Sequence, residues 1–275
     1  MSRLDEDHVH FASLAGRATA GALADDVALA HRLADLAGEI ALRHRHRPRT
    51  RWKWDGSPIT EADLEIDQAI HAVLASERPD DGILTEERTE RGGTSGRRWI
   101  IDPLDGTSLY AYGDDGWGTL IALQVGDELP LGLVHYPADG RRYWAATGAG
   151  AHRAVVDSSG PTVTPIAVSP ISDLASARAT AWQREDLPGA RLLRSATRWQ
   201  VPDQYFLMRL LDGDLDVLYS TGGEIWDHAA GVAVLTGAGG SFCDHQGGRR
   251  IDRRGGIYTN GPLERPVLDL LGVDR

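Results

Sequence analysis

The chain has 275 residues, of which 41% are hydrophobic and 25% are charged, and its formal net charge is −11. A surface of that sign repels nucleic acid and anionic membranes, so neither is expected as a partner. No apolar run reaches the roughly 18 residues of a membrane-spanning helix. The single cysteine, Cys243, excludes an internal disulfide. Together with an N-terminus that lacks signal-peptide features, it indicates a cytoplasmic protein.

The first half of the chain predicts helices followed by a meander. Residues 1–24 are small, polar or alanine-rich, and we expect a loosely attached leader there. Apolar residues recur at helical spacing over 25–46, and a second helix is predicted over 61–77. The sequence between them, RPRTRWKWDGSP, contains an Asp-Gly turn signal and predicts a loop or hairpin. Short β-prone runs between Gly- and Asp-rich turns over 99–147 predict an antiparallel meander.

The second half predicts alternating strands and helices. Residues 158–165, SSGPTVTP, form the best candidate boundary, so we expect one half at 25–160 and another at 161–275. Beyond the boundary, a strand near Ala179 and the strand LDVLYS alternate with a helix near 204–211 and the helix WDHAAGVAVLTGAG. This alternation is typical of an α/β arrangement.

The segment Trp99–Ser108, WIIDPLDGTS, places two aspartates directly after an apolar run. Carboxylates held together at a strand end repel each other unless a proton or a cation lies between them. Mg²⁺ prefers carboxylate oxygens and completes its shell with water and phosphate oxygens. Gly106 lets the backbone approach a ligand, and Thr107 adds a hydroxyl that can orient a water. Asp102 and Asp105 therefore indicate a metal-assisted phosphoryl-transfer site.

Other acidic residues stand at the ends of predicted elements, and each has a structural explanation on its own. Asp63 fits a capping box with Thr60, and Asp227 in a first helical turn complements the helix dipole. The pair Glu86-Glu87 is most simply explained as a solvated turn. Only their combination with the paired aspartates favours a shared chemical role.

Four motifs together resemble the inositol monophosphatase superfamily. WIIDPLDGT matches its metal-site signature, and WDHAAGVAVLTGAGG matches its second signature. ILTEE and SPITEAD match its Glu-Glu and Thr-x-x-Asp elements, in the family's order and over residues 50–260. The resemblance implies a layered α/β sandwich (α-β-α-β-α) of the inositol monophosphatase/fructose-bisphosphatase type. It also implies a metal site between two halves that meet near residue 160, in a protein expected to be a homodimer.

By position, the resemblance implies two or three Mg²⁺ ions held by oxygen donors. The first ion would be bound by Glu86, Asp102 and the Leu104 carbonyl. The second would be bound by Asp102, Asp105 and Asp227. Asp63 would lie near a third, weaker site, with Lys53 close by.

The resemblance also implies how the remaining motif residues act on a phosphomonoester. Gly106 and Thr107 would offer N–H groups to the phosphate. Thr107, with Glu86, would orient the attacking water for in-line displacement, while Asp105 contributes through the second ion. The expected partner is a small-molecule phosphomonoester.

The substrate pocket departs from the family pattern. Thr85 and Leu109 replace a usual glycine and asparagine, and Ser220 stands where relatives carry a glutamate that binds sugar hydroxyls. Asp203 resembles the histidinol-phosphate phosphatase branch, although Pro202 replaces that branch's glycine. We expect Ser220 and Asp203 to face the leaving group, with Asp203 as an anionic acceptor for a substrate amine. A helix N-cap is the structural alternative for Asp203.

The leading hypothesis is a Mg²⁺-dependent phosphatase that hydrolyses a small metabolite phosphomonoester, with histidinol phosphate as one candidate. Inositol monophosphatase activity is an alternative, as is a nucleoside or cyclitol monophosphate phosphatase of a specialised biosynthetic pathway. A catalytically silent metal- or phosphate-binding protein is the non-enzyme alternative. The joint presence of all the motif residues argues against that last possibility: Glu86, Asp102, Asp105, Thr107 and Asp227.

Overall fold

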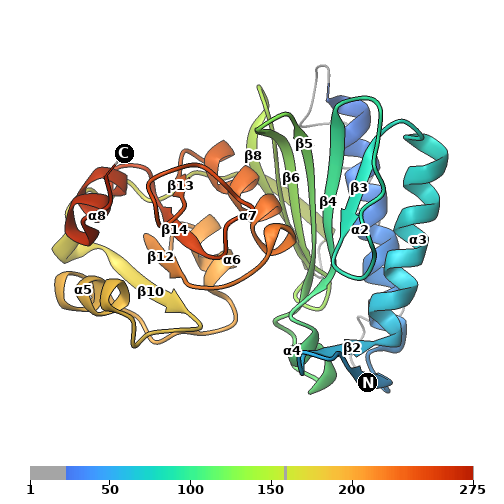
Figure 1. Cartoon of the computed structure of the whole chain (residues 1–275), viewed down its shortest axis with the longest axis horizontal. Coiled ribbons are helices and arrows are strands. Elements are labelled where there is room, and N and C mark those ends of the chain that lie inside the picture. Colours follow the sequence, from blue (N-terminus) through green and yellow to red (C-terminus); the bar gives the residue numbers. More distant parts are fainter. Residues whose placement is uncertain (1–22, 158–159, 275) are drawn as a thin grey trace.

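The computed structural model describes residues 23–157 and 160–274, so nearly all of the expected leader, 1–24, lies outside the described residues. Figure 1 shows two β-sheets side by side with helices outside and between them. Among the described residues the first sheet has seven strands in the order β3-β4-β5-β6-β7-β8-β9. Their bounds are β3 Gly82–Thr85, β4 Arg97–Asp105, β5 Gly118–Val125, β6 Glu128–Tyr136, β7 Arg141–Ala146, β8 Gly150–Asp157 and β9 Gly160–Pro165.

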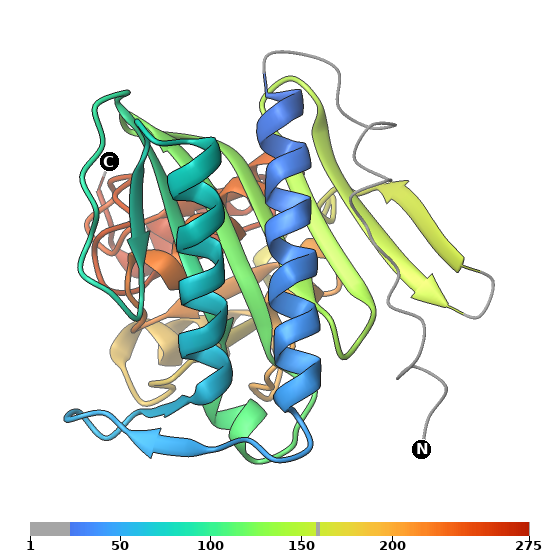
Figure 2. The same ribbon diagram turned by 90° about the vertical axis from the view of Figure 1, so that its right-hand side faces the viewer.

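From β4 to β9, neighbouring strands of this sheet pair antiparallel. The edge strand β3 pairs parallel with β4. The meander predicted over 99–147 is therefore confirmed. Two helices, α2 (Ala24–His44) and α3 (Glu61–Glu77), lie along the outer face of the sheet, as Figure 2 shows. The predicted bounds of α3 match the observed ones.

The apolar run at the start of β4 reflects burial of both faces of the sheet. Trp99 and Ile101 pack in the core under α2 and α3, whereas Ile100 packs in the core on the opposite face. Successive side chains of a strand alternate between faces, so a strand covered on both sides is apolar throughout.

The second sheet has the order β11-β10-β12-β14-β13. β10 runs parallel to β11 and β12, while β14 runs antiparallel to β12 and β13. The bounds are β10 Arg178–Trp182, β11 Arg198–Trp199, β12 Val217–Ser220, β13 Ser241–Cys243 and β14 Gly256–Thr259. Its helices are α5 Pro188–Ala196, α6 Phe206–Leu211, α7 Ile225–Gly237 and α8 Glu264–Leu271, with a 3₁₀ turn η2 at Leu174–Ser176.

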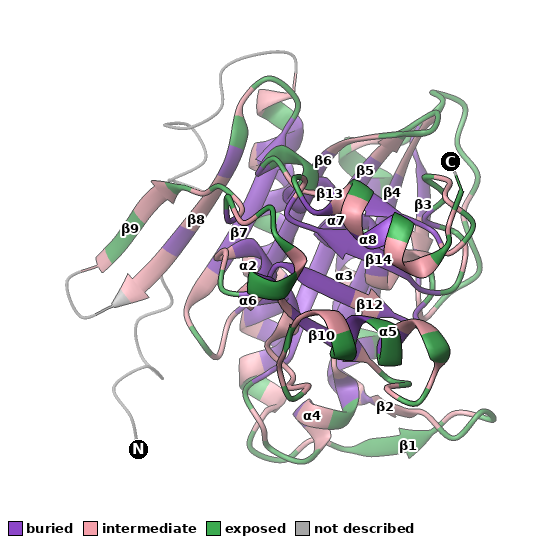
Figure 3. Cartoon of the chain, turned by 90° about the vertical axis from the view of Figure 1, so that its left-hand side faces the viewer, coloured by how far each residue is buried: buried purple, intermediate pink, exposed green. Residues whose placement is uncertain are grey.

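The layers follow the expected α-β-α-β-α order. α6 and α7 pack between the two sheets, and α5 and α8 cover the outer face of the second sheet. Figure 3 shows α7 and the central strands buried within this stack. α7 is apolar nearly all round because it is covered on both sides. The fold prediction is confirmed.

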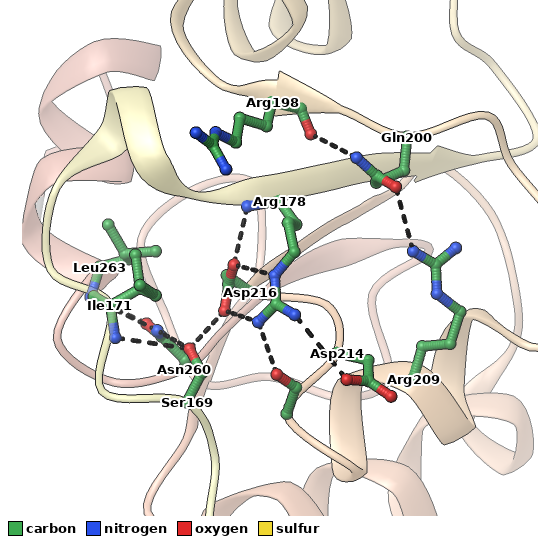
Figure 4. Close-up of polar contacts among 11 residues, drawn as sticks. Ser169, Ile171, Arg178, Arg198, Gln200, Arg209, Asp214, Asp216, Asn260 and Leu263 are labelled. Carbon is green, nitrogen blue, oxygen red and sulfur yellow. Dashed lines mark hydrogen bonds and ion pairs between the residues drawn. The ribbon is translucent and has the colours of Figure 1, made fainter.

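The passage from one sheet to the other lies beyond the expected boundary. Gly160–Pro165 forms β9, which pairs with β8 as the last strand of the first sheet. The chain is then anchored to the second sheet by a buried polar network (Figure 4). In it the Asp216 carboxylate accepts hydrogen bonds from the Ser169 hydroxyl and from Arg178, whose Nε and Nη2 lie 2.9 Å from its two oxygens.

Two smaller elements lie at the end of the molecule where the motifs meet. The hairpin predicted around Asp55-Gly56 is formed by β1 (Thr50–Trp52) and β2 (Pro58–Thr60), and the short helix α4 (Thr107–Ala111) follows β4. None of the helices in the described part of the chain is long and apolar enough to cross a membrane.

Candidate active site

An extra residue in β4 brings its two aspartates to the same face of the sheet. Asp102 pairs with Leu120 and Asp105 pairs with Gly118, so three steps along β4 correspond to two along β5. Residues three apart on a regular strand face opposite sides, and a one-residue bulge cancels that alternation. The bulge therefore explains how both carboxylates reach one site.

Asp227 joins these two aspartates from α7. Carboxylate oxygens of Asp102, Asp105 and Asp227 all lie within 4.8 Å of one another, close enough to ligate one cation. Asp227 is the third residue of α7 and forms a capping box with Glu224, the residue before the helix. Its Oδ2 accepts a hydrogen bond from the Glu224 N–H at 2.5 Å. Asp227 can therefore cap α7 and belong to the acidic cluster at the same time.

The electrostatics of this cluster favour a bound cation. Burial, together with the charges of Asp227 and Glu86, raises the pKa of Asp105 to about 7. Burial and the Glu86 charge raise the pKa of Asp227 to about 6. The pKa of Asp102 is raised as well, by burial and by Glu86 and Asp105. One buried and two half-buried carboxylates that resist ionisation together are a donor set that a hard divalent cation satisfies.

Glu86 extends the acidic cluster along the first sheet. It follows β3, lines the same cavity, and accepts a hydrogen bond from Lys53 Nζ at 2.7 Å. The same ammonium group lies 2.8 Å from Glu87, which is largely buried. Lys53 therefore holds both glutamates, and burial raises the pKa of Glu87 to about 7.

Thr107 and Asp63 form a hydrogen-bonded pair beside the cluster. The Thr107 hydroxyl lies 2.9 Å from Asp63 Oδ1 and 3.0 Å from the Leu104 carbonyl. The other Asp63 oxygen accepts from the Thr60 N–H and hydroxyl in the predicted capping box. Asp63 is buried and, unlike the other predicted site residues, does not line the cavity.

Gly106 connects β4 to α4 in a conformation that favours glycine. Its φ is +78°, in the left-handed region, and it is the N-cap residue of α4. The turn places Gly106 and Thr107 along the cavity wall next to Asp105. Exposed N–H groups at such a turn can bind a phosphate oxygen.

The cavity that these residues line has a volume of about 730 Å³ and extends to the second sheet. Both predicted substrate-contacting residues border it. The Ser220 hydroxyl donates to the Gly222 carbonyl at 3.0 Å. The Asp203 oxygens accept from the Tyr205 N–H at 2.8 Å and from Arg209 Nη1 at 2.7 Å. The predicted residues therefore line one cavity, except Asp63, which lies behind Thr107 and accepts its hydrogen bond.

Arg209 also fixes the loop that carries Asp203. Its Nη2 donates to Gln200 Oε1 at 3.4 Å, and Gln200 Nε2 donates to the Arg198 carbonyl at 3.0 Å (Figure 4). The loop before α6 is therefore held by paired polar groups.

Sequence reasoning missed part of the cavity wall. Trp182, Gln183 and Phe206 line it, and so does Arg254, whose guanidinium forms an ion pair with Glu224 at 3.0 Å. These residues carry no recognisable motif. The available signal was the position of Trp182 and Gln183 at the end of β10 and of Phe206 at the start of α6.

Comparison with known proteins agrees with this geometry. The family model described as the inositol monophosphatase family matches residues 23–268, nearly the whole chain. The chain belongs to the inositol monophosphatase family. The histidinol-phosphatase and inositol-1-monophosphatase relatives identify the family as phosphomonoester hydrolases, so this member is a phosphoric monoester hydrolase of a metal-dependent family.

The proteins that this chain resembles carry names that refer to different activities. A Streptomyces griseus protein named glucose-1-phosphate thymidylyltransferase is 39% identical over 90% of this chain and 96% of its own length. Histidinol-phosphatase from Mycobacterium tuberculosis is 33% identical over 90% of this chain and 98% of its own. The structure of an inositol monophosphatase from Zymomonas mobilis has a TM-score of 0.77 and is 29% identical. It covers 92% of this chain and 100% of its own.

Proposed function

We propose that this family member is a Mg²⁺-dependent phosphatase of a small metabolite monophosphate, with histidinol phosphate as the first candidate substrate. The observation that carries the proposal is the convergence of Asp102, Asp105 and Asp227 at one end of a cavity of small-molecule size. The resemblance of Asp203 to the histidinol-phosphate branch and the identity to histidinol-phosphatases support the substrate.

The three aspartates are a donor set that fits Mg²⁺. As the resemblance implies, Asp102, Asp105 and Asp227 would hold one ion, and Glu86, Asp102 and the Leu104 carbonyl would hold another. Bound there, Mg²⁺ would polarise the phosphoryl group and stabilise the leaving alkoxide. The Thr107 hydroxyl donates to Asp63 and so keeps its lone pairs to accept a hydrogen bond from the attacking water. Lys53 holds Glu86 in place, and the Glu86 carboxylate would help to orient that water.

Gly106 and Thr107 would bind the phosphate through their N–H groups at the turn into α4. The raised pKa values of the acidic residues limit their charge until the cation binds, which couples metal binding to proton release. We also propose that the protein is a cytoplasmic homodimer. The single cysteine supports the location, and the family resemblance supports the dimer.

A nucleotidyl transfer, as in the name of the Streptomyces griseus relative, is not favoured by this cavity. A nucleoside triphosphate carries several negative charges and is usually bound by cationic side chains and N–H groups. Among the described lining residues Arg254 is the one cationic side chain, and it is paired with Glu224.

The test is a phosphate-release screen of the purified chain over metabolite monophosphates, with and without Mg²⁺. The panel holds histidinol phosphate, myo-inositol 1-phosphate, a nucleoside monophosphate and glucose 1-phosphate with dTTP. We expect Mg²⁺-dependent phosphate release that is greatest for histidinol phosphate, and no pyrophosphate from dTTP. Pyrophosphate formation without phosphate release would contradict the proposal.

A further inference from the structure

Two aromatic rings form a wall of the cavity on the side of the second sheet. Trp182 ends β10 and Phe206 begins α6, and their ring centroids lie 5.5 Å apart at an interplanar angle of 33°. Both rings are half-buried and line the cavity. Incompletely covered aromatic rings at a binding cavity offer a surface on which a planar group can pack.

The residue after Trp182 has a strained backbone. Gln183 has a φ of +75°, and among the described residues it is the one non-glycine with a positive φ. The Arg184 N–H donates to the Trp182 carbonyl at 3.2 Å, so Gln183 is the central residue of a γ-turn of the rare, strained kind. Such strain persists where the surrounding structure enforces it, and it is concentrated at functional sites.

The neighbouring loop enforces this turn. The Trp182 carbonyl also accepts from the Thr221 N–H at 3.4 Å and the Thr221 hydroxyl at 3.2 Å. The Gln183 side-chain amide lies directly against Gly222, where a Cβ would collide with it. The absence of a side chain at Gly222 leaves room for the exposed Gln183 amide at the edge of the cavity.

The Gln183 amide is unpaired among the described residues, whereas the other polar groups of this wall have partners. The Gln204 amide donates to Asp114 at 3.3 Å, and the Ser220 hydroxyl donates to Gly222. Both Asp203 oxygens accept hydrogen bonds from within the loop and α6. Gln183 therefore offers two N–H donors and a carbonyl acceptor to a ligand.

We propose that Trp182, Phe206 and Gln183 form a subsite for a leaving group that carries a heteroaromatic ring. The ring would pack on the two aromatic side chains, and a ring nitrogen would hydrogen-bond to the Gln183 amide. This inference rests on the proposed phosphatase function and names a substrate class for it. In this proposal Gln183, rather than Asp203, hydrogen-bonds to the leaving group.

The experiment compares kcat/KM for three matched monophosphates with Mg²⁺: propyl, phenylethyl and imidazolylethyl phosphate. The phenylethyl-to-propyl ratio measures the ring, and the imidazolylethyl-to-phenylethyl ratio measures its nitrogens. Trp182→Ala should lower the first ratio by about tenfold through loss of aromatic packing. Gln183→Gly should lower the second ratio by about fivefold, the effect of one hydrogen bond. Arg184→Ala, at the adjacent exposed residue, is the control and should change neither ratio.

Gln183→Gly should also keep or raise Tm, because glycine relieves the positive φ. Ratios near one in the wild-type chain, or ratios that both variants leave unchanged, would overturn the subsite. If no monophosphate is hydrolysed, the proposed function fails, and ligand-detected NMR with imidazolylethanol decides the subsite separately. Binding that Gln183→Gly abolishes supports it, and no binding to the wild-type chain overturns it.

Discussion

The acidic cluster and the aromatic wall line the same cavity but are built by different means. The cluster is made of carboxylates fixed by a strand bulge, a capping box and an ammonium group that bridges two glutamates. The wall is made of half-buried rings and an amide held by a strained turn. The cluster opposes its own ionisation and needs a cation, whereas the wall is neutral and needs only a ligand of matching shape. We therefore expect chemistry and specificity to depend on separate residues.

Loss of one metal ligand should have the largest effect. Asp105→Asn removes a charge from the cation site, and a metal ion contributes several kcal/mol of transition-state stabilisation, so kcat should fall by at least about 10³-fold. The fold should persist, because the carboxylates repel one another when metal is absent. Phosphate release at saturating Mg²⁺ and thermal melting with EDTA measure the two effects. Activity near that of the wild-type chain would remove Asp105 from the site.

Loss of the Thr107 hydroxyl should have the next largest effect. Thr107→Val keeps the shape of the side chain but removes the group that donates to Asp63, and kcat should fall by about 10²-fold. Thr236→Val is the matched control, since that hydroxyl donates to carbonyls of its own helix. Equal losses in the two variants would mean that Thr107 acts only through stability.

A change at Asp203 tests whether the wall or the loop charge selects the substrate. Because its carboxylate is paired with Arg209, Asp203→Ala should lower kcat/KM for histidinol phosphate and glycerol 2-phosphate by similar factors, about threefold each. A loss confined to histidinol phosphate would restore Asp203 as the acceptor of the substrate amine. Both rates come from the same phosphate-release assay.

The stability of the metal-free protein should depend on pH through the acidic cluster. The folded-state pKa values of Asp105 and Asp227, about 7 and about 6, lie above the ordinary aspartate value of 3.8. The folded state therefore binds more protons, and stability that is present below about pH 4 is lost as the pH rises toward 7. With EDTA, Tm should be lower at pH 7 than at pH 5 by at least about 2 °C.

Added Mg²⁺ should remove this difference in Tm, and Asp105→Asn should reduce it. A Tm that is independent of pH with EDTA, or that rises toward pH 7, would contradict the raised pKa values.

The acidic cluster could be predicted from the sequence because its residues lie at the ends of regular elements. Asp102 and Asp105 come directly after the apolar run that marks β4, and Asp227 lies in the first turn of α7, a helix that its long apolar sequence marks. The bulge between the two aspartates was not predicted, since it is set by pairing with β5. β9 was not predicted either, because a Pro- and Gly-containing segment favours a loop until a neighbouring strand pairs with it.

The wall could not be predicted for a different reason. Glutamine has no preference for a left-handed backbone, so the γ-turn at Gln183 follows from the contacts of Thr221 and Gly222. The pairing of Asp203 with Arg209 joins a loop to the helix after it, and the sequence gives no sign of that geometry. Long-range contacts, rather than local preference, decide which polar groups remain free for a ligand.

The most direct test of the central claim is a crystal structure of the chain grown with Mn²⁺ in place of Mg²⁺, with anomalous scattering used to locate the ion. We expect an anomalous peak between Asp102, Asp105 and Asp227, and we expect Asp105→Asn to weaken or abolish it. A peak at another site, or an empty cluster in crystals of a chain that Mn²⁺ activates, would contradict it.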